Sequence, residues 1–276
     1  MNPAAATLAL LMASAVLSAA CAVYCALDVR FHFAGFARVL SGLFGLLLVL
    51  QSSLIGLQVV GGARFSLAYQ ILILTAWGLL ACSLFFNRYL FADLIGVLVC
   101  GVDSALLVLA LLMRQPEPCC PAPAAAPGLS WLLYLHVSAI LLSYVVLTLA
   151  FISALGYLLR DRGLKSKRRG RALDSLPPLA TLEGFTDRFV LAGFLALTAG
   201  IVLSQVFVVA SHRRGIFFDP REALALVSWL LYAAYAGLRL LVRFEGRRLA
   251  LLVVAGYATG LAPAVVITSL GAARPF

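Results

Sequence analysis

The chain has 276 residues, of which 63% are hydrophobic and 12% charged, whereas a soluble globular domain carries about 25% charged residues. This composition, together with a mean hydropathy of +1.05, excludes an ordinary soluble enzyme and indicates a membrane protein. The net charge of +10 does not indicate nucleic-acid binding, because no polar region is long enough to form a soluble domain. We expect the positive charge to orient the chain in the bilayer.

Apolar segments follow one another along the whole chain. A helix needs about 20 residues to cross the hydrocarbon layer of ~30 Å, because its backbone groups must be satisfied within the segment. The sequence therefore predicts an all-α fold, a polytopic membrane helix bundle in a single integral membrane domain over residues 1–276. About eight transmembrane helices are expected, at 4–27, 39–60, 67–86, 90–113, 130–159, 189–210, 223–242 and 249–270.

The first segment has some likeness to a secretory signal, since Ser18-Ala19-Ala20-Cys21 is similar to a lipoprotein cleavage site. No basic residue precedes it, however, and the apolar run continues past Cys25. A secretory signal has a charged start and a shorter apolar core. We expect this segment to be a mature transmembrane helix.

The distribution of Lys and Arg predicts the orientation of the spans. With the N-terminus outside, 15 of the 21 basic residues lie on the inner side. The positive-inside rule therefore predicts a multi-pass protein of the cell inner (cytoplasmic) membrane with both termini outside. The basic stretch 160–171 then lies inside, where we expect it to contact anionic lipid headgroups.

The sequence lacks the motifs of common metal sites and enzyme classes. The six cysteines form no C-x-x-C pair and no Cys/His spacing typical of zinc. No hydrolase, kinase or P-loop motif occurs, so we expect no conventional enzyme activity. Cys119 and Cys120 lie in the proline-rich outer linker Pro116–Gly128, where an intermolecular disulfide and two free thiols are both open.

Asp103 is a carboxyl group about ten residues into the span 90–113. Ionising it at that depth costs several kcal/mol, so we expect it to be protonated, hydrogen-bonded or exposed to a wet cavity. Gln51 and Gln58, seven residues apart on one face of the second span, are candidate donors. A structural contact between spans is the preferred interpretation, and a proton or ligand path is the alternative.

The predicted topology separates the three histidines. His32 lies in an inner loop, whereas His136 and His212 lie at the outer ends of the fifth and sixth spans. Neutral imidazole is the usual axial ligand of haem iron, and two such groups on one membrane face suit a flat apolar macrocycle. The alternative is an interfacial histidine that is hydrogen-bonded to a loop.

From Trp131 onward, the chain resembles the cytochrome c assembly family, the membrane haem-handling proteins of the CcsA/CcmC type. The best matching region is 131–270. Ala76-Trp77, in the third span, also resembles the corresponding family helix. The motifs that carry the resemblance after Trp131 are Leu135-His136-Val137, Ser143-Tyr144, the stretch from Leu176 to Glu183, Gly193-Phe194, Gly200, the run from Phe217 to Glu222, the run from Trp229 to Tyr235, and Arg239.

The sequence departs from the family pattern in the outer loop. Family members that handle haem directly have a tryptophan-rich loop there, which presents an aromatic shelf. Here Ile216 and Phe218 stand in place of two tryptophans, and His212 stands where the leading one is expected. Gly237 occupies the position of the family's histidine in the following span. These departures resemble the tryptophan-poor HemX-like branch.

The resemblance implies an accessory haem-handling protein of cytochrome c assembly that binds or presents haem at its outer face. The implied haem-contacting residues are His136, His212, Phe217, Phe218, Asp219 and Trp229, with His136 and His212 as ligands of the iron. Asp219 and Pro220 also suit a simple helix start, as N-cap and first helical residue.

The implied partners are the lipid bilayer and other cytochrome c assembly or haem-synthesis proteins. Two alternatives remain open at this point. One is a HemX-like regulator that acts on haem biosynthesis through a cytosolic partner. The other is a small-solute permease that uses Asp103 and the glutamines of the second span.

Overall fold

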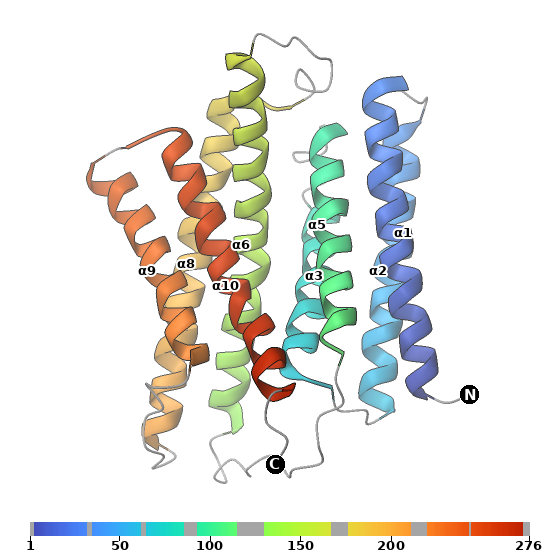
Figure 1. Ribbon diagram of the computed structural model, residues 1–276, viewed down its shortest axis with the longest axis vertical. Coiled ribbons are helices and arrows are strands. Elements are labelled where there is room, and N and C mark those ends of the chain that lie inside the picture. Colours follow the sequence, from blue (N-terminus) through green and yellow to red (C-terminus); the bar gives the residue numbers. More distant parts are fainter. Residues whose placement is uncertain are drawn as a thin grey trace. The chain divides into compact units, whose positions relative to one another are not determined.

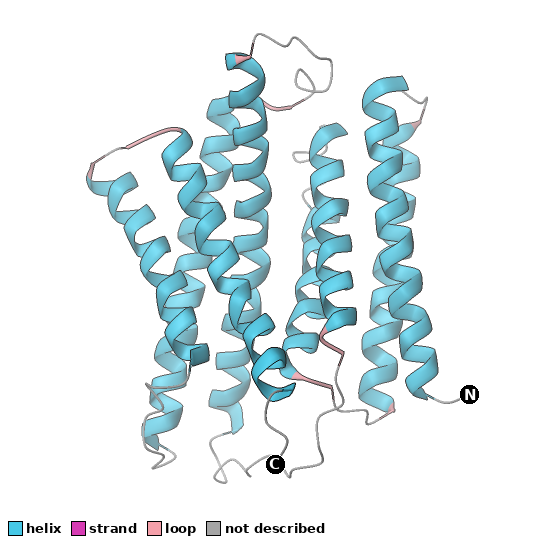
Figure 2. Ribbon diagram, in the orientation of Figure 1, coloured by secondary structure: helices cyan, strands magenta, loops and turns pink. Residues whose placement is uncertain are grey.

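The computed structural model describes residues 3–31, 35–61, 65–85, 93–114, 130–166, 176–210, 220–242 and 244–272. Every regular element in these ranges is a helix (Figure 2). The helices, labelled in Figure 1, are α1 (Pro3–Phe31), α2 (Phe36–Val60), α3 (Leu67–Phe85), α5 (Asp93–Leu112), α6 (Ser130–Lys165), α8 (Leu179–Ala210), α9 (Pro220–Leu241) and α10 (Arg247–Ala272).

Seven of the helices in the described ranges, α1 to α9, are long and apolar enough to cross a membrane. The side chains of α10 after residue 262 lie outside the described residues. The prediction of a polytopic membrane helix bundle is therefore confirmed.

Two helices are longer than the spans predicted for them. α6 has 36 residues and α8 has 32, which at 1.5 Å per residue gives about 54 and 48 Å, well beyond the hydrocarbon layer. The spans 130–159 and 189–210 were bounded by charged residues, but a helix can continue into the polar region. On α6 the ion pair between Lys165 and Asp161, one turn apart at 2.9 Å, accompanies this extension.

The first part of the basic stretch 160–171 is therefore helical, and residues 167–171 lie outside the described residues. α8 begins at Leu179, directly after Pro177-Pro178. Each proline ring disfavours the helical conformation of the residue before it, so the helix does not extend further toward the N-terminus. The Arg160 guanidinium donates to the carbonyls of Leu176 and Pro177. This contact ties the end of α6 to the start of α8.

The chain divides into two compact units, each described here by itself. Unit 1 comprises Met1–Pro116 with Ile152–Glu183, and unit 2 comprises Glu117–Phe151 with Gly184–Phe276. In unit 1, α1 packs against α2 and α5, and α3 packs against α2 and α5 (Figure 1). In unit 2, α9 packs against α10. The single domain predicted for the whole chain stays a prediction.

α1 buries one continuous face in unit 1. Its buried residues recur at alternating spacings of four and three, which keeps them on one side of a helix. Most of them are small or polar, as is common where membrane helices approach closely. At no more than 2% exposure, they are Thr7, Leu11, Ser14, Ser18, Cys21, Cys25 and Asp28.

Unit 2 is built around aromatic side chains from α9 and α10. Tyr232, Tyr235 and Tyr257 are buried, and the ring of Tyr257 stacks on Phe151 of α6 with centroids 4.4 Å apart. The turn that reverses the chain between α9 and α10 contains Gly246 with φ +99°, a conformation that favours glycine. The turn lets the two helices lie against each other.

Candidate functional site

Two glycines of α8 let α6 approach closely in unit 2. A Cβ at Gly193 would lie 2.7 Å from Cγ and Cδ2 of Leu147, and a Cβ at Gly200 would lie 2.5 Å from Cδ1 of Ile140. Gly193 and Gly200 are seven residues apart, so both face α6. A larger residue at either position requires the facing Leu147 or Ile140 side chain to rotate or the two helices to separate.

The close approach brings His136 of α6 onto the backbone of α8. Its Nδ1 lies 2.8 Å from the carbonyl oxygen of Gly200. A carbonyl only accepts, so Nδ1 carries the proton, and in the neutral ring the lone pair is then on Nε2. The ring is half-buried. This is the usual environment of a metal-binding imidazole, whose other nitrogen donates to a backbone carbonyl.

Trp229 of α9 is held by the same part of α8. Its Nε1 donates to Oγ1 of Thr198 at 2.9 Å, and its ring lies against Phe194 with centroids 5.7 Å apart. Thr198 and Gly200 are two residues apart, about 3 Å along a helix axis. His136 and Trp229 are therefore anchored to α8 at nearly the same level.

A charged cluster joins α8 to α9 at another level of unit 2. Asp187 accepts a hydrogen bond from the Tyr235 hydroxyl at 2.6 Å, and it pairs with Arg239 through Nε at 2.9 Å and Nη2 at 2.7 Å. Arg239 also pairs with Glu245 at 3.1 Å and donates to the carbonyl of Phe244 at 3.1 Å. This geometry holds α8, α9 and the following turn in a fixed arrangement, which is a structural role.

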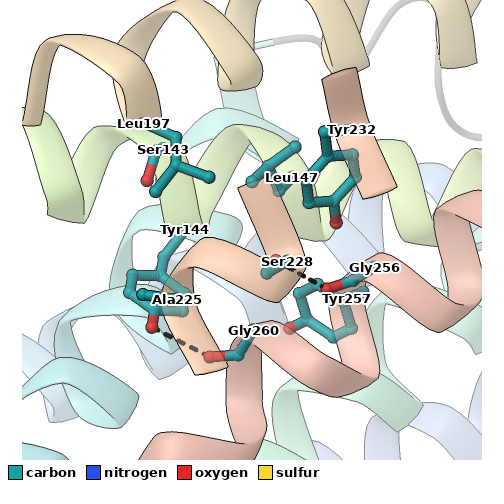
Figure 3. Close-up of a pocket in the computed structure, with 10 residues that line it drawn as sticks. All are labelled: Ser143, Tyr144, Leu147, Leu197, Ala225, Ser228, Tyr232, Gly256, Tyr257 and Gly260. Carbon is teal, nitrogen blue, oxygen red and sulfur yellow. Dashed lines mark hydrogen bonds between the residues drawn. The ribbon is translucent and has the colours of Figure 1, made fainter. Parts of the chain in front are cut away.

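A small cavity of about 30 Å³ lies among α6, α8, α9 and α10 (Figure 3). Its hydroxyl groups come from Ser143, Tyr144, Ser228, Tyr232 and Tyr257. Tyr144 and Ser228 donate to carbonyls of α10, at Gly260 and Gly256, whereas the Tyr232 hydroxyl is buried and has no hydrogen-bond partner in the described structure. The lining is neutral, and the space suits water rather than a macrocycle.

The remaining predicted haem contacts, His212, Phe217, Phe218 and Asp219, lie outside the described residues. The pairing of His136 with His212 therefore stays a prediction. α9 begins at Pro220, where a proline suits the first helical position. In the described ranges, no group of three or more His, Cys, Asp or Glu forms a metal site, but haem iron needs only axial ligands from a protein.

Unit 1 contains Gln51 and Gln58, the two candidate hydrogen-bond donors to Asp103. Gln51 contacts the buried Asp103, so the predicted polar contact between spans is confirmed. Gln58 donates instead to the hydroxyl of Tyr69 at 2.8 Å.

Sequence reasoning placed Gly193, Gly200 and Arg239 in motifs but assigned them no contact. The signal for the glycines was their spacing of seven residues on an apolar helix, which is typical of a close helix contact. The sequence feature that could have indicated the pair of Asp187 and Arg239 is their opposite charge near the ends of consecutive spans. Neither signal identifies the partner atom.

Comparison with known proteins identifies the relatives of this chain. The profile of the family described as Cytochrome C assembly protein matches residues 65–262. Cytochrome c biogenesis protein CcsA of Parasynechococcus marenigrum is 29% identical over 245 residues, which cover 78% of this chain and 80% of that protein. The proteins of the same name from Porphyra purpurea and Synechococcus elongatus are 27% and 26% identical, over 68% and 75% of this chain and 70% and 77% of their own lengths. The match begins well before Trp131 and includes the site around His136, so the chain belongs to the cytochrome c assembly protein family.

Proposed function

We propose that this protein is an accessory haem-handling membrane protein of cytochrome c assembly, which binds haem as cargo and presents it at its outer face. The relatives are named for cytochrome c biogenesis, which supports the assembly role. The observation that carries the haem proposal is the orientation of His136, whose Nδ1 donates to Gly200 and leaves Nε2 available.

Different residues of unit 2 bind the iron, orient the ligand and contact the porphyrin in this proposal. His136 supplies Nε2 to the iron, and the Gly200 carbonyl fixes the tautomer and the rotation of the ring. Trp229, held by Thr198 at the same level of α8, provides an aromatic surface for the porphyrin. His212, Phe217, Phe218 and Asp219 are the proposed contacts from the loop that precedes α9.

An absorption spectrum of the detergent-purified protein tests this proposal. The protein is expressed with an ample supply of haem, and protein purified without haem is then titrated with it. We expect a Soret band that saturates at one haem per chain and is weakened in His136→Ala. His32→Ala is the matched control, because the predicted topology places His32 on the inner side. A protein that neither carries nor takes up haem would contradict the proposal.

A further inference from the structure

Asp103, in unit 1, lies near the middle of α5 and is 0% exposed. The Gln51 side-chain amide of α2 lies 3.3 and 3.4 Å from its two oxygens. Gln51 is itself fully buried, and its Oε1 has no hydrogen-bond partner in the described structure. The carboxyl group therefore has one neutral donor group at long distance, whereas an ionised carboxylate offers about four acceptor positions.

The hydroxyl of Ser18, on α1, is the second neighbour of this carboxyl group. Ser18 donates its only proton to the carbonyl oxygen of Cys100 at 3.1 Å. With its proton donated to Cys100, the Ser18 oxygen presents a lone pair toward Asp103. A lone pair repels a carboxylate and accepts a hydrogen bond from a carboxylic acid.

Among the described residues, no Lys or Arg on the helices packed around Asp103 forms an ion pair with it. α3 contains no charged residue, and the one cation of α2 is Arg38, 13 positions from Gln51. On α1, Asp28 and Arg30 are at least ten residues beyond Ser18. The thiol of Cys21 lies close enough to interact with Asp103, and the thiols of Cys21 and Cys25 both contact Cys100. Arg114 is eleven residues beyond Asp103, about 16 Å along a helix, and it donates to Thr7.

α6 also reaches this part of unit 1 but brings no cation to the carboxyl group. Its Gly156 approaches Leu98 of α5, five residues before Asp103. The cations of α6 are further along the helix, at Arg160, Arg162 and Lys165. Arg160 donates to Leu176 and Pro177, and Lys165 pairs with Asp161.

We propose that Asp103 is an intramembrane proton-binding site, occupied by a proton when α1, α2 and α5 are packed as observed. An unpaired carboxylate at this depth is strongly unfavourable, whereas the neutral acid matches the one donor and the one acceptor that face it. Its O–H donates to Oγ of Ser18, and its C=O accepts from Nε2 of Gln51. The site is separate from the proposed haem contacts and does not rest on the proposed function.

Infrared spectroscopy of the purified protein at neutral pH tests the proposal directly. The difference spectrum between the wild type and Asp103→Asn is expected to contain the C=O stretch of a carboxylic acid, which moves to lower frequency in D2O. Asp28→Asn is the control, because Asp28, on α1, is the other buried carboxyl group among the described residues, and this variant should keep the Asp103 band. Loss of carboxylate stretches alone in Asp103→Asn would overturn the proposal.

A second variant tests the same site without changing Asp103. Gln51→Leu removes the donor to the acid carbonyl, so the C=O band should move to higher frequency while remaining present. Because this variant keeps the carboxyl group, it decides the question even if Asp103→Asn fails to fold. A carboxylic-acid band that stays at the wild-type frequency in Gln51→Leu, or that is absent, would overturn the proposed contact between the amide and a protonated acid.

Discussion

Gly200→Ala separates two opposite effects of adding a methyl group to a helix. In water, alanine is favoured over glycine in a helix interior by about 1 kcal/mol. At Gly200, however, the new Cβ would lie 2.5 Å from Cδ1 and 2.9 Å from Cγ1 of Ile140, with the backbone nitrogen of Ile140 at 3.5 Å. Ile140 must rotate or α6 must move outward, and outward movement also stretches the hydrogen bond from His136 to the Gly200 carbonyl.

These distances set the expected magnitude. Overpacking costs roughly 1–3 kcal/mol, and the loss of a hydrogen bond costs about 1 kcal/mol. After the gain in helix propensity, we expect Gly200→Ala to lower the free energy of unfolding by about 2 kcal/mol. Gly193→Ala meets Leu147 at 2.7 Å but touches no His136 contact, so it should destabilise less and leave haem binding intact.

Gly184→Ala is the matched control on the same helix, because the added Cβ would have no atom within 4 Å apart from its chain neighbours and the backbone of its own helix. It should leave stability unchanged or raise it by up to about 1 kcal/mol. Denaturant unfolding in detergent, followed by circular dichroism, measures all three variants, and Ile140→Ala should restore part of the stability lost in Gly200→Ala. Equal effects of the three substitutions would refute the close packing of α6 on α8.

Three further predictions concern the clusters in unit 2 and the topology. Asp187→Asn removes the charge that pairs with Arg239, and because both side chains are partly exposed, at 16% and 21%, we expect a loss of only about 1–2 kcal/mol in unfolding experiments. Tyr232→Phe removes a buried hydroxyl that has no hydrogen-bond partner in the described structure, so it should keep or raise the melting temperature. Tyr235→Phe breaks the hydrogen bond to Asp187 and should lower the melting temperature. A large decrease in Tyr232→Phe would show that water satisfies the Tyr232 hydroxyl. Tags near Lys167 and in the Cys119-Cys120 linker should label from opposite sides of the membrane, and labelling from one side would refute the span order.

Sequence patterns predicted the helices well because the bilayer imposes a strong constraint on each span. The second span was expected at 39–60, and α2 runs from Phe36 to Val60. The extension of α8 back to Leu179 was missed because hydropathy reports the apolar layer and not where helical hydrogen bonding stops. The environment of His136 was also missed, since a glycine carbonyl 64 residues away leaves no mark in the composition of either segment.

The contacts of Asp103 show what a sequence can predict about a buried polar group. Its depth alone implied a protonated or hydrogen-bonded state, and Gln51 was one of two candidate donors. The choice between Gln51 and Gln58 depended on how α2 and α5 are placed relative to each other along their axes, because the two glutamines share one helix face and lie two turns apart along it. Packing fixed that choice by burying Gln51.

Imidazole rescue of His136→Gly tests most directly whether His136 holds haem iron. The purified variant is titrated with haem and its Soret band is recorded before and after imidazole is added, with His32→Gly treated in the same way. If Nε2 of His136 is an axial ligand, the variant should lose the wild-type band, and imidazole should restore it by filling the vacated coordination position. A His136→Gly spectrum identical to that of the wild type, with no response to imidazole, would contradict the assignment.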